Sequence, residues 1–374
     1  MTKNSKLPET RTGFRRQRQE FAAPQGTGSG GAPTLGEYYF RPEVVRVALV
    51  AGVVISILFY ERVQLTTGGA IVPAYLAMFL PAPLFVVTTV LSGYLTYFVV
   101  SVVVAKRKIL YGRRKFEVEM LVGLVFVTLG TGAALLLRSD RPLYLGLTGI
   151  GFLLPGVIAH DMFRQGPRKT LFALAATTAI LGLFVFVFAS LLEIAPFETS
   201  LASVPSAPAG TGYPISLILP AAVVSVLAGM LVFAQLGLRS GGFITGAYLA
   251  LMLTRPLDIA YAVGVAGVTW LLVTKLIMPR LLIFGRRKLS IMVVCGAIIA
   301  WGVELIIRAI TADAYIPWEG FTLITLMVPA LLANDAQRQG LERTVWGATI
   351  TTLSVFGAMN LLAAVLRTIG VLEL

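Results

Sequence analysis

Two short blocks of cations have the composition of an anion-binding site. In each block a glycine is followed by Arg-Arg-Lys, at positions 112–115 and again at 285–288. Guanidinium groups provide paired donors that match the geometry of a carboxylate or a phosphate. One isolated block could equally be a stop-transfer anchor that contacts lipid phosphates, but its presence in both halves of the chain favours a polyanion. The candidate residues are Arg113, Arg114, Lys115, Arg286, Arg287 and Lys288.

A second recurring block combines an aspartate, an arginine and a glutamine after a proline. Residues 155–166 align with 329–340, and half of the pairs are identical. The aspartate and the arginine lie three residues apart, so they can form a salt bridge on one helix face. Alternatively, the arginine and the glutamine face a substrate while the aspartate holds the arginine in place. The candidate residues are Asp161, Arg164, Gln165, Asp335, Arg338 and Gln339.

A third pair of segments, 68–83 and 241–256, is too short and too broken for a full membrane crossing. Each contains Gly-Gly, a tyrosine and a late proline. Irregular backbone at membrane depth is tolerated only when it is buried in protein or lines a wet cavity. Half-helix N-termini there could present N–H groups to carboxylates; the alternative is tight helix packing through small residues. The candidate residues are Gly68, Gly69, Tyr75, Gly241, Gly242 and Tyr248.

Several kinds of chemistry are not expected. The chain has one cysteine and one histidine, too few for a thiolate or histidine metal site. The histidine, His160, has Asn334 as its counterpart, which disfavours a catalytic role. Glu61 ends the first apolar segment without an acidic counterpart, and we keep it with Asp161 and Asp335 as a possible acid or a structural carboxylate. No nucleotide-binding Walker motif is present, so any ATP is hydrolysed by another polypeptide.

These residues lie in a duplicated membrane domain. A shift of about 173 positions superimposes the two halves, and more than half of the pairs between 68–84 and 241–257 are identical. With 57% hydrophobic and 13% charged residues and a mean hydropathy of +0.84, the chain is predicted to be an all-α polytopic membrane protein. We expect about ten transmembrane helices, five per repeat. They fall at 44–60, 84–105, 120–137, 143–158, 171–192, 217–236, 257–278, 291–307, 321–332 and 345–366.

The domain boundaries follow from composition. We predict a disordered basic cytoplasmic tail at 1–40, membrane repeat 1 at 41–194, a linker at 195–212 and membrane repeat 2 at 213–374. The net charge of +13 suits a polyanion or anionic lipid headgroups, and no nucleic acid is expected as a partner. Five crossings per repeat would invert repeat 2, whereas a re-entrant segment would leave the repeats parallel. Neither arrangement places every basic cluster in the cytoplasm, and we favour inverted halves.

The chain resembles the PgsC/CapC family, the integral membrane subunit of bacterial poly-γ-glutamate synthases. The resemblance lies in 109–116 (ILYGRRKF), in the spacing from Glu61 to Gly69, Pro73 and Tyr75, and in the block 155–166. Repeat 2 resembles a second, diverged copy, which keeps 285–288 and Tyr248 but has Ala234 in place of the acid.

The resemblance implies a multi-subunit machine in the bacterial inner membrane. Its expected partners are a Mur-ligase-like amide ligase that holds ATP and Mg, an extracytoplasmic subunit, the anionic polyglutamate chain and membrane lipids. The chain itself is expected to bind no cofactor and to be non-catalytic alone. Two alternatives remain: an independent secondary transporter for a small organic anion, and a membrane transferase that uses Glu61, Asp161 or Asp335.

Overall fold

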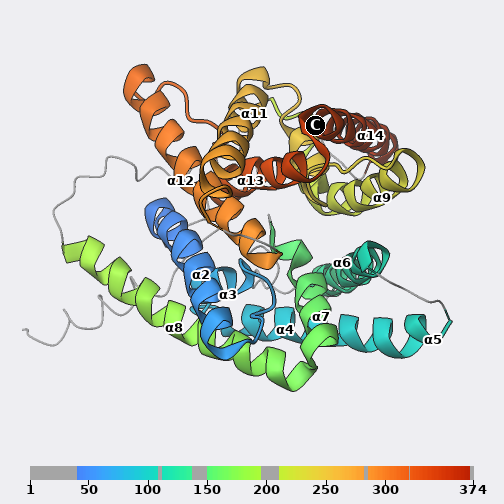
Figure 1. Ribbon diagram of the computed structural model, residues 1–374. Coiled ribbons are helices and arrows are strands. Elements are labelled where there is room, and N and C mark those ends of the chain that lie inside the picture. The colour runs from blue at the N-terminus through green and yellow to red at the C-terminus, as the bar shows by residue number, and fades with distance from the viewer. Residues whose placement is uncertain are drawn as a thin grey trace, which may run out of the picture. The chain divides into compact units, whose positions relative to one another are not determined.

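The computed structural model describes residues 40–107, 112–136, 150–194, 210–281, 285–319 and 321–370 (Figure 1). Within these ranges every regular element is a helix. Seven of the described helices are long and apolar enough to cross a membrane, which confirms the all-α polytopic fold. The predicted tail and most of the predicted linker lie outside the described residues.

The two repeats contain the same helices in the same order, except that among the described residues the three-residue helix α5 occurs in repeat 1 alone. Repeat 1 comprises α2 (Pro42–Val63), α3 (Val72–Met78), α4 (Pro83–Phe98), α5 (Ala105–Arg107), α6 (Gly112–Leu136), α7 (Leu154–Gln165) and α8 (Pro167–Ile194). Repeat 2 comprises α9 (Ile218–Leu236), α10 (Thr245–Leu251), α11 (Pro256–Leu271), α12 (Arg286–Thr311), α13 (Thr322–Gln339) and α14 (Leu341–Thr368). Short 3₁₀ turns, η3 (Ile150–Leu153) and η4 (Ile215–Leu217), precede α7 and α9.

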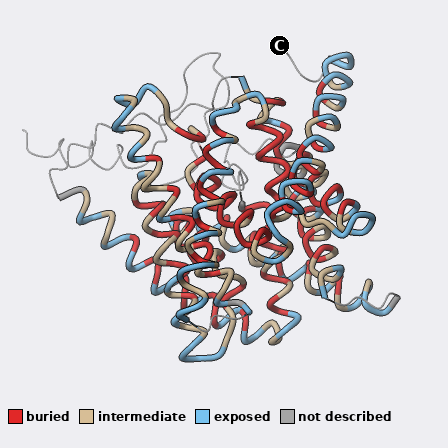
Figure 2. Tube along the Cα trace, turned by 45° about the horizontal axis from the view of Figure 1, so that its top comes forward, coloured by how far each residue is buried: buried red, intermediate tan, exposed pale blue. Residues whose placement is uncertain are grey.

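Lipid-facing and core-facing surfaces are clearly separated. Figure 2 shows buried positions along the inner parts of the bundle and exposed positions on the outer helices. On the outer helices α8 and α14, Leu183 and Leu361 are 69% and 71% exposed. Large apolar side chains at that exposure are suited to a hydrocarbon environment rather than to water.

The Gly-Gly segments form a sixth helical element in each repeat, in addition to the five that the sequence predicts. Every residue of α3 and of α10 is buried. Gly68, Gly69, Gly241 and Gly242 have φ of +76°, +103°, +80° and +111°, a region that side chains with a Cβ rarely adopt. A Cβ on Gly69 would also lie 2.6 Å from Val157 Cγ1. Glycine is therefore required here by both backbone conformation and space.

A π-helical segment occurs at the same place in both repeats. Helix α4 continues as η1 (Val99–Val104), and α11 continues as η5 (Leu272–Ile277). Each segment is six residues long and leads toward one of the Arg-Arg-Lys blocks. Its presence in both copies shows that the wider turn belongs to the repeat design and is not an isolated irregularity.

Three helix ends of repeat 1 meet at one end of the bundle. The backbone N–H of Thr66, just after α2, donates to the side-chain oxygen of Gln165, the last residue of α7. The start of α6 reaches the same place, since Glu119 lies 2.6 Å from Nδ1 of His160 in α7. Helix α2 therefore ends where α6 begins.

The corresponding helix of repeat 2 begins at that same end, so the repeats are parallel. Arg287, at the start of α12, lies 3.2 Å from Glu61 at the end of α2. At their other ends the same two helices are joined by a salt bridge between Arg46 and Glu304. Since α6 and α12 both start beside the end of α2, the expectation of inverted halves is wrong. In each repeat the Gly-Gly segment and its short helix, α3 or α10, lead back across the bundle. This additional crossing makes the number of crossings per repeat even.

The basic clusters that follow the N-terminal tail consequently belong to one end of the bundle. We call it the basic end: the ends of α2, α7, α9 and α13 and the starts of α6, α8, α12 and α14. The positions 113–115, 164–169, 286–288 and 338–343 all fall there. The sequence alone could not place these clusters on one side, because it weighed five passes per repeat or a re-entrant segment but no sixth pass formed by the Gly-Gly segment.

The repeats are joined by a buried ion pair with no equivalent on the other side of the bundle. The side chains of Arg46 and Glu304 are 8% and 2% exposed, and Arg46 also lies over the ring of Trp301. The corresponding positions of the opposite repeats are Leu219 and Thr131. The duplicated interface has therefore diverged from a symmetric contact.

We predict that Glu304→Thr lowers the free energy of unfolding by about 3–5 kcal/mol, because it leaves Arg46 as an unpaired buried charge. The double variant Arg46→Leu/Glu304→Thr copies Leu219 and Thr131 and should stay within about 1 kcal/mol of the wild type. Denaturant unfolding of the purified chain in detergent measures both. Equal stability of the single variant and the wild type would contradict the prediction.

Candidate functional site

A glutamine at the end of α7 and of α13 holds the loop that enters the broken segment. The side-chain oxygen of Gln165 accepts the N–H of Thr66, and its amide donates to the carbonyl of the same residue and to Thr170. Gln339 makes the same three bonds with Arg239 and Thr344. Both amide protons of each glutamine are thus used within the protein. The two glutamines therefore hold the loops that follow α2 and α9. Their contact with a polyanion stays a prediction.

An aspartate one turn earlier fixes the Gly-Gly backbone. Asp161 accepts the N–H of Gly69 at 3.0 Å, and Asp335 accepts the N–H of Gly241 at 3.1 Å. The predicted meeting of broken-segment N–H groups with carboxylates therefore occurs within the chain itself. Asp335 also lies 3.9 Å from Arg239, a cation that the sequence analysis did not single out.

The cations at the start of α6 are paired with acids one helical turn later. Arg113 lies 2.7 Å from Glu117, and Lys115 lies 3.8 Å from Glu119. Glu119 is buried and also contacts His160 at 2.6 Å. Neither glutamate was among the sequence candidates, although the four-residue spacing from Arg113 and Lys115 could have revealed them.

The cations at the start of α12 have different partners. Arg287 reaches Glu61, so this acid, one of the three predicted, forms an ion pair between the repeats. Lys288 donates to the neutral side chain of Gln337. The side chain of Arg286 lies outside the described residues.

The two repeats bring their cations together on one aromatic ring. Phe233, at the end of α9, has the guanidinium carbon of Arg113 3.8 Å from its ring centroid and that of Arg239 at 5.9 Å. Burial, together with the like charges of Arg113 and Arg338, lowers the pKa of the Arg239 guanidinium, and Asp335 opposes that shift. Arg113 and Arg338, from two other helix ends, are therefore within electrostatic range of Arg239.

Other predicted cations are exposed at the same end. Arg114, Arg164 and Arg338 are exposed, and within the described ranges none of them makes a hydrogen bond or salt bridge. Exposed arginines beside half-buried ones form a surface that can bind a carboxylate with forked donors. The structure thus gathers the cationic candidates whose side chains it describes.

The predicted tyrosines lie deeper, in the core. Tyr75 and Tyr248 are fully buried. Tyr75 stacks on Phe79 with ring centroids 4.9 Å apart, and Tyr248 packs edge-on against Phe321 at 5.6 Å. These side chains support α3 and α10 and lie within the packed bundle.

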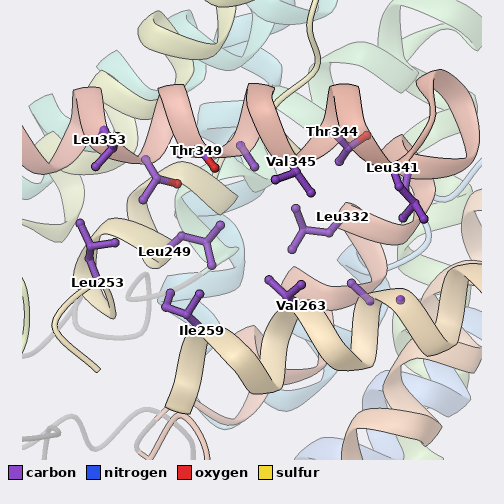
Figure 3. A pocket seen from close by; sticks show the side chains of 15 residues that line it. Leu249, Leu253, Ile259, Val263, Leu332, Leu341, Thr344, Val345, Thr349 and Leu353 are labelled. Atoms are coloured by element: carbon purple, nitrogen blue, oxygen red, sulfur yellow. The ribbon is translucent and has the colours of Figure 1, made fainter. Parts of the chain in front are cut away.

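An apolar cavity of about 270 Å³ lies between α10, α11, α13 and α14 (Figure 3). Figure 3 shows Leu249, Ile259, Val263 and Leu353 directed into it. None of its lining residues is charged. An ionised carboxylate would be costly to bury against such a lining, so the anion-binding candidate remains the basic end. Among the described residues, no group of three or more His, Cys, Asp or Glu could hold a metal ion.

Comparison with known proteins agrees with this duplicated architecture. A family model described as capsule biosynthesis CapC matches residues 51–171 and again 224–345. The capsule biosynthesis protein CapC of Bacillus anthracis is 33% identical over 142 residues, which cover 37% of this chain and 93% of the relative. The PGA biosynthesis protein CapC of Bacillus subtilis is 33% identical over 146 residues, 38% of this chain and 95% of the relative. No solved structure matches. The chain therefore belongs to the CapC family of capsule biosynthesis proteins, and it carries the family's domain twice.

Proposed function

We propose that this protein is the integral membrane subunit of a complex that makes and exports poly-γ-glutamate or a related anionic polymer. Its basic end would dock an ATP-dependent amide ligase and guide the polymer into the membrane. The observation that carries the proposal is the convergence of Arg113 and Arg239, from different repeats, on one ring at one end of the bundle. The names of the relatives, which refer to capsule and PGA biosynthesis, point to the same polymer class.

The chemistry of such a polymer explains the need for clustered cations. Each γ-linked glutamate carries one free carboxylate, so a chain entering a low-dielectric region would lose hydration at every residue. Fixed guanidinium groups offset that loss by supplying charge-assisted hydrogen bonds. Charged groups inside membrane proteins commonly mark the path of an ion or substrate.

The charge distribution also bears on orientation. Because cations near membrane-spanning segments favour the cytoplasm, we propose that the basic end faces the cytoplasm of a bacterial cell. Helix α2 would then begin at the opposite face. The basic tail at 1–40 favours the other assignment, a cytoplasmic N-terminus, but the basic end holds more cations next to spanning helices.

The proposed complex assigns ATP and Mg to the partner ligase and leaves this chain non-catalytic. An extracytoplasmic subunit would meet the face opposite the basic end. Glu61, Asp161 and Asp335 have protein partners in the structure: Arg287 for Glu61, and backbone N–H groups for the two aspartates. Those contacts support a structural rather than a catalytic use of the three acids.

We predict that the chain, purified from detergent-solubilised native membranes, brings with it a Mur-ligase-like partner and ATP- and glutamate-dependent polymer synthesis. Mass spectrometry of the eluate and a polymer assay measure both. A chain that purifies alone and binds a small organic anion would instead favour the secondary transporter.

Neutralising the shared ring site should reduce polymer output. We expect Arg113→Gln/Arg239→Gln to lower output about tenfold or more, because each lost charged hydrogen bond weakens anion binding by about 1.5–3 kcal/mol. Arg367→Gln, an exposed arginine of α14 far from the basic end, is the control and should behave as the wild type. Polymer yield is normalised to the amount of inserted protein. Unchanged output from the double variant would remove the polyanion role of these arginines.

Cysteine labelling tests the orientation. In a Cys295→Ser background, Asp313→Cys lies beyond the end of α12, and Arg114→Cys lies at the basic end. We expect an impermeant maleimide to label position 313 in intact spheroplasts and to label position 114 only after lysis. The reverse pattern would place the basic end outside.

A further inference from the structure

The basic end contains two sites with the same framework. Site 1 surrounds Asp161, and site 2 surrounds Asp335. In each, the aspartate accepts a glycine N–H and the neighbouring glutamine braces the incoming loop. Because the framework is the same, any difference in ligand binding must come from the side chains that differ between the repeats.

Site 1 is internally neutralised. Glu119 is buried and lies 3.8 Å from Lys115 and 2.6 Å from His160. The ammonium of Lys115 also lies over the ring of Phe163. Glu61 of the same repeat also pairs with a cation, Arg287 from the start of α12. Of the two interacting cations of site 1, Lys115 is therefore balanced by Glu119, and Arg164 is the one that stays unpaired among the described residues.

Site 2 keeps its positive charge. Arg239 stands where site 1 has Thr66, and Met292 stands where site 1 has Glu119. Lys288 consequently meets the neutral Gln337 instead of a carboxylate. The acid Glu61 has Ala234 as its counterpart. Each of these differences makes site 2 more positive than site 1.

Three differences run the other way and do not reverse the balance around Asp335. Arg62 has Gln235 as its counterpart, and Arg168 has Glu342. Glu117, whose counterpart is Ser290, pairs with Arg113 beside site 2. Arg113, Arg239, Lys288 and Arg338 still outnumber the two carboxylates in range, Glu117 and Asp335. Partly buried charges of this kind are less screened by salt than exposed ones.

We propose that the two sites have diverged, so that only site 2 binds the polymer's carboxylates and each chain holds one polymer strand. This inference rests on the proposed function and adds which half of the duplicate recognises the ligand. Arg338 supplies an exposed forked donor, and Arg113 and Arg239 supply the half-buried charge on Phe233. Site 1 keeps the same framework as a structural counterpart.

Binding of a fluorescent γ-linked hexaglutamate to the full chain in neutral detergent tests this inference. We expect one probe per chain. Arg338→Gln should weaken binding about tenfold, the loss of one charged hydrogen bond, whereas the matched variant Arg164→Gln in site 1 should change it less than twofold. Both positions are exposed, so the variants should fold. Copying site 2 into site 1 with Thr66→Arg/Glu119→Met should raise the stoichiometry toward two.

The outcomes separate this inference from the proposed function. Two probes per wild-type chain, or equal weakening by Arg164→Gln and Arg338→Gln, would overturn the divergence while leaving polyanion binding intact. Absence of probe binding by the wild type would overturn both. Low concentrations of phosphatidylglycerol could displace the probe from site 2 while unlabelled polyglutamate does not. That result would show that site 2 binds lipid phosphates instead.

Discussion

The structure depends on how the broken backbone of each repeat is satisfied. A chain that leaves helical geometry inside a membrane exposes N–H and C=O groups that have no water to bind. Here a carboxylate and a carboxamide from the adjacent helix end provide the missing partners: Asp161 and Gln165 in repeat 1, and Asp335 and Gln339 in repeat 2. These bonds allow α3 and α10 to enter the bundle as short buried helices. The even number of passes in each repeat follows from that extra pass, and so does the position of the basic clusters at 113–115, 164–169 and 286–288.

The even number of crossings in each repeat has a direct electrostatic consequence. With the repeats parallel, the starts of α6 and α12 and the ends of α2 and α9 all lie at the basic end. Like charges at such proximity are costly unless acids or aromatic rings accompany them. The protein supplies both, through Glu117 and Glu119 after the first block and through the ring of Phe233 between Arg113 and Arg239. What remains is a surface with excess positive charge held on rigid helix ends.

Duplication within one chain allows this surface to be asymmetric. Two identical subunits around a two-fold axis must present identical sites, whereas fused copies can differ at each position. The salt bridge between Arg46 and Glu304 exists at only one of the two inter-repeat contacts, and Glu119 and Arg239 each occur in only one repeat. The framework residues, in contrast, are the same in both copies. The residues that the copies share thus hold the backbone, and the residues that differ set the charge around Asp161 and Asp335.

The sequence by itself determined the helical membrane fold, the duplication and the composition of the candidate site, because apolar runs and matching blocks are local properties of the chain. It could not determine whether the halves run parallel, because the number of passes depends on whether 68–83 turns back or continues inward, and hydrogen bonds to residues about a hundred positions away decide that. It missed Arg239 and Phe233, since neither belongs to a recurring motif and only the packing of α9 against α6 brings them to Arg113. It also left Gln165 and Gln339 open as ligand contacts, whereas the tertiary structure uses their amides to hold the loops after α2 and α9. The local sequence pattern thus determined the helices. Long-range hydrogen bonds and helix packing determined which charged side chains lie close together.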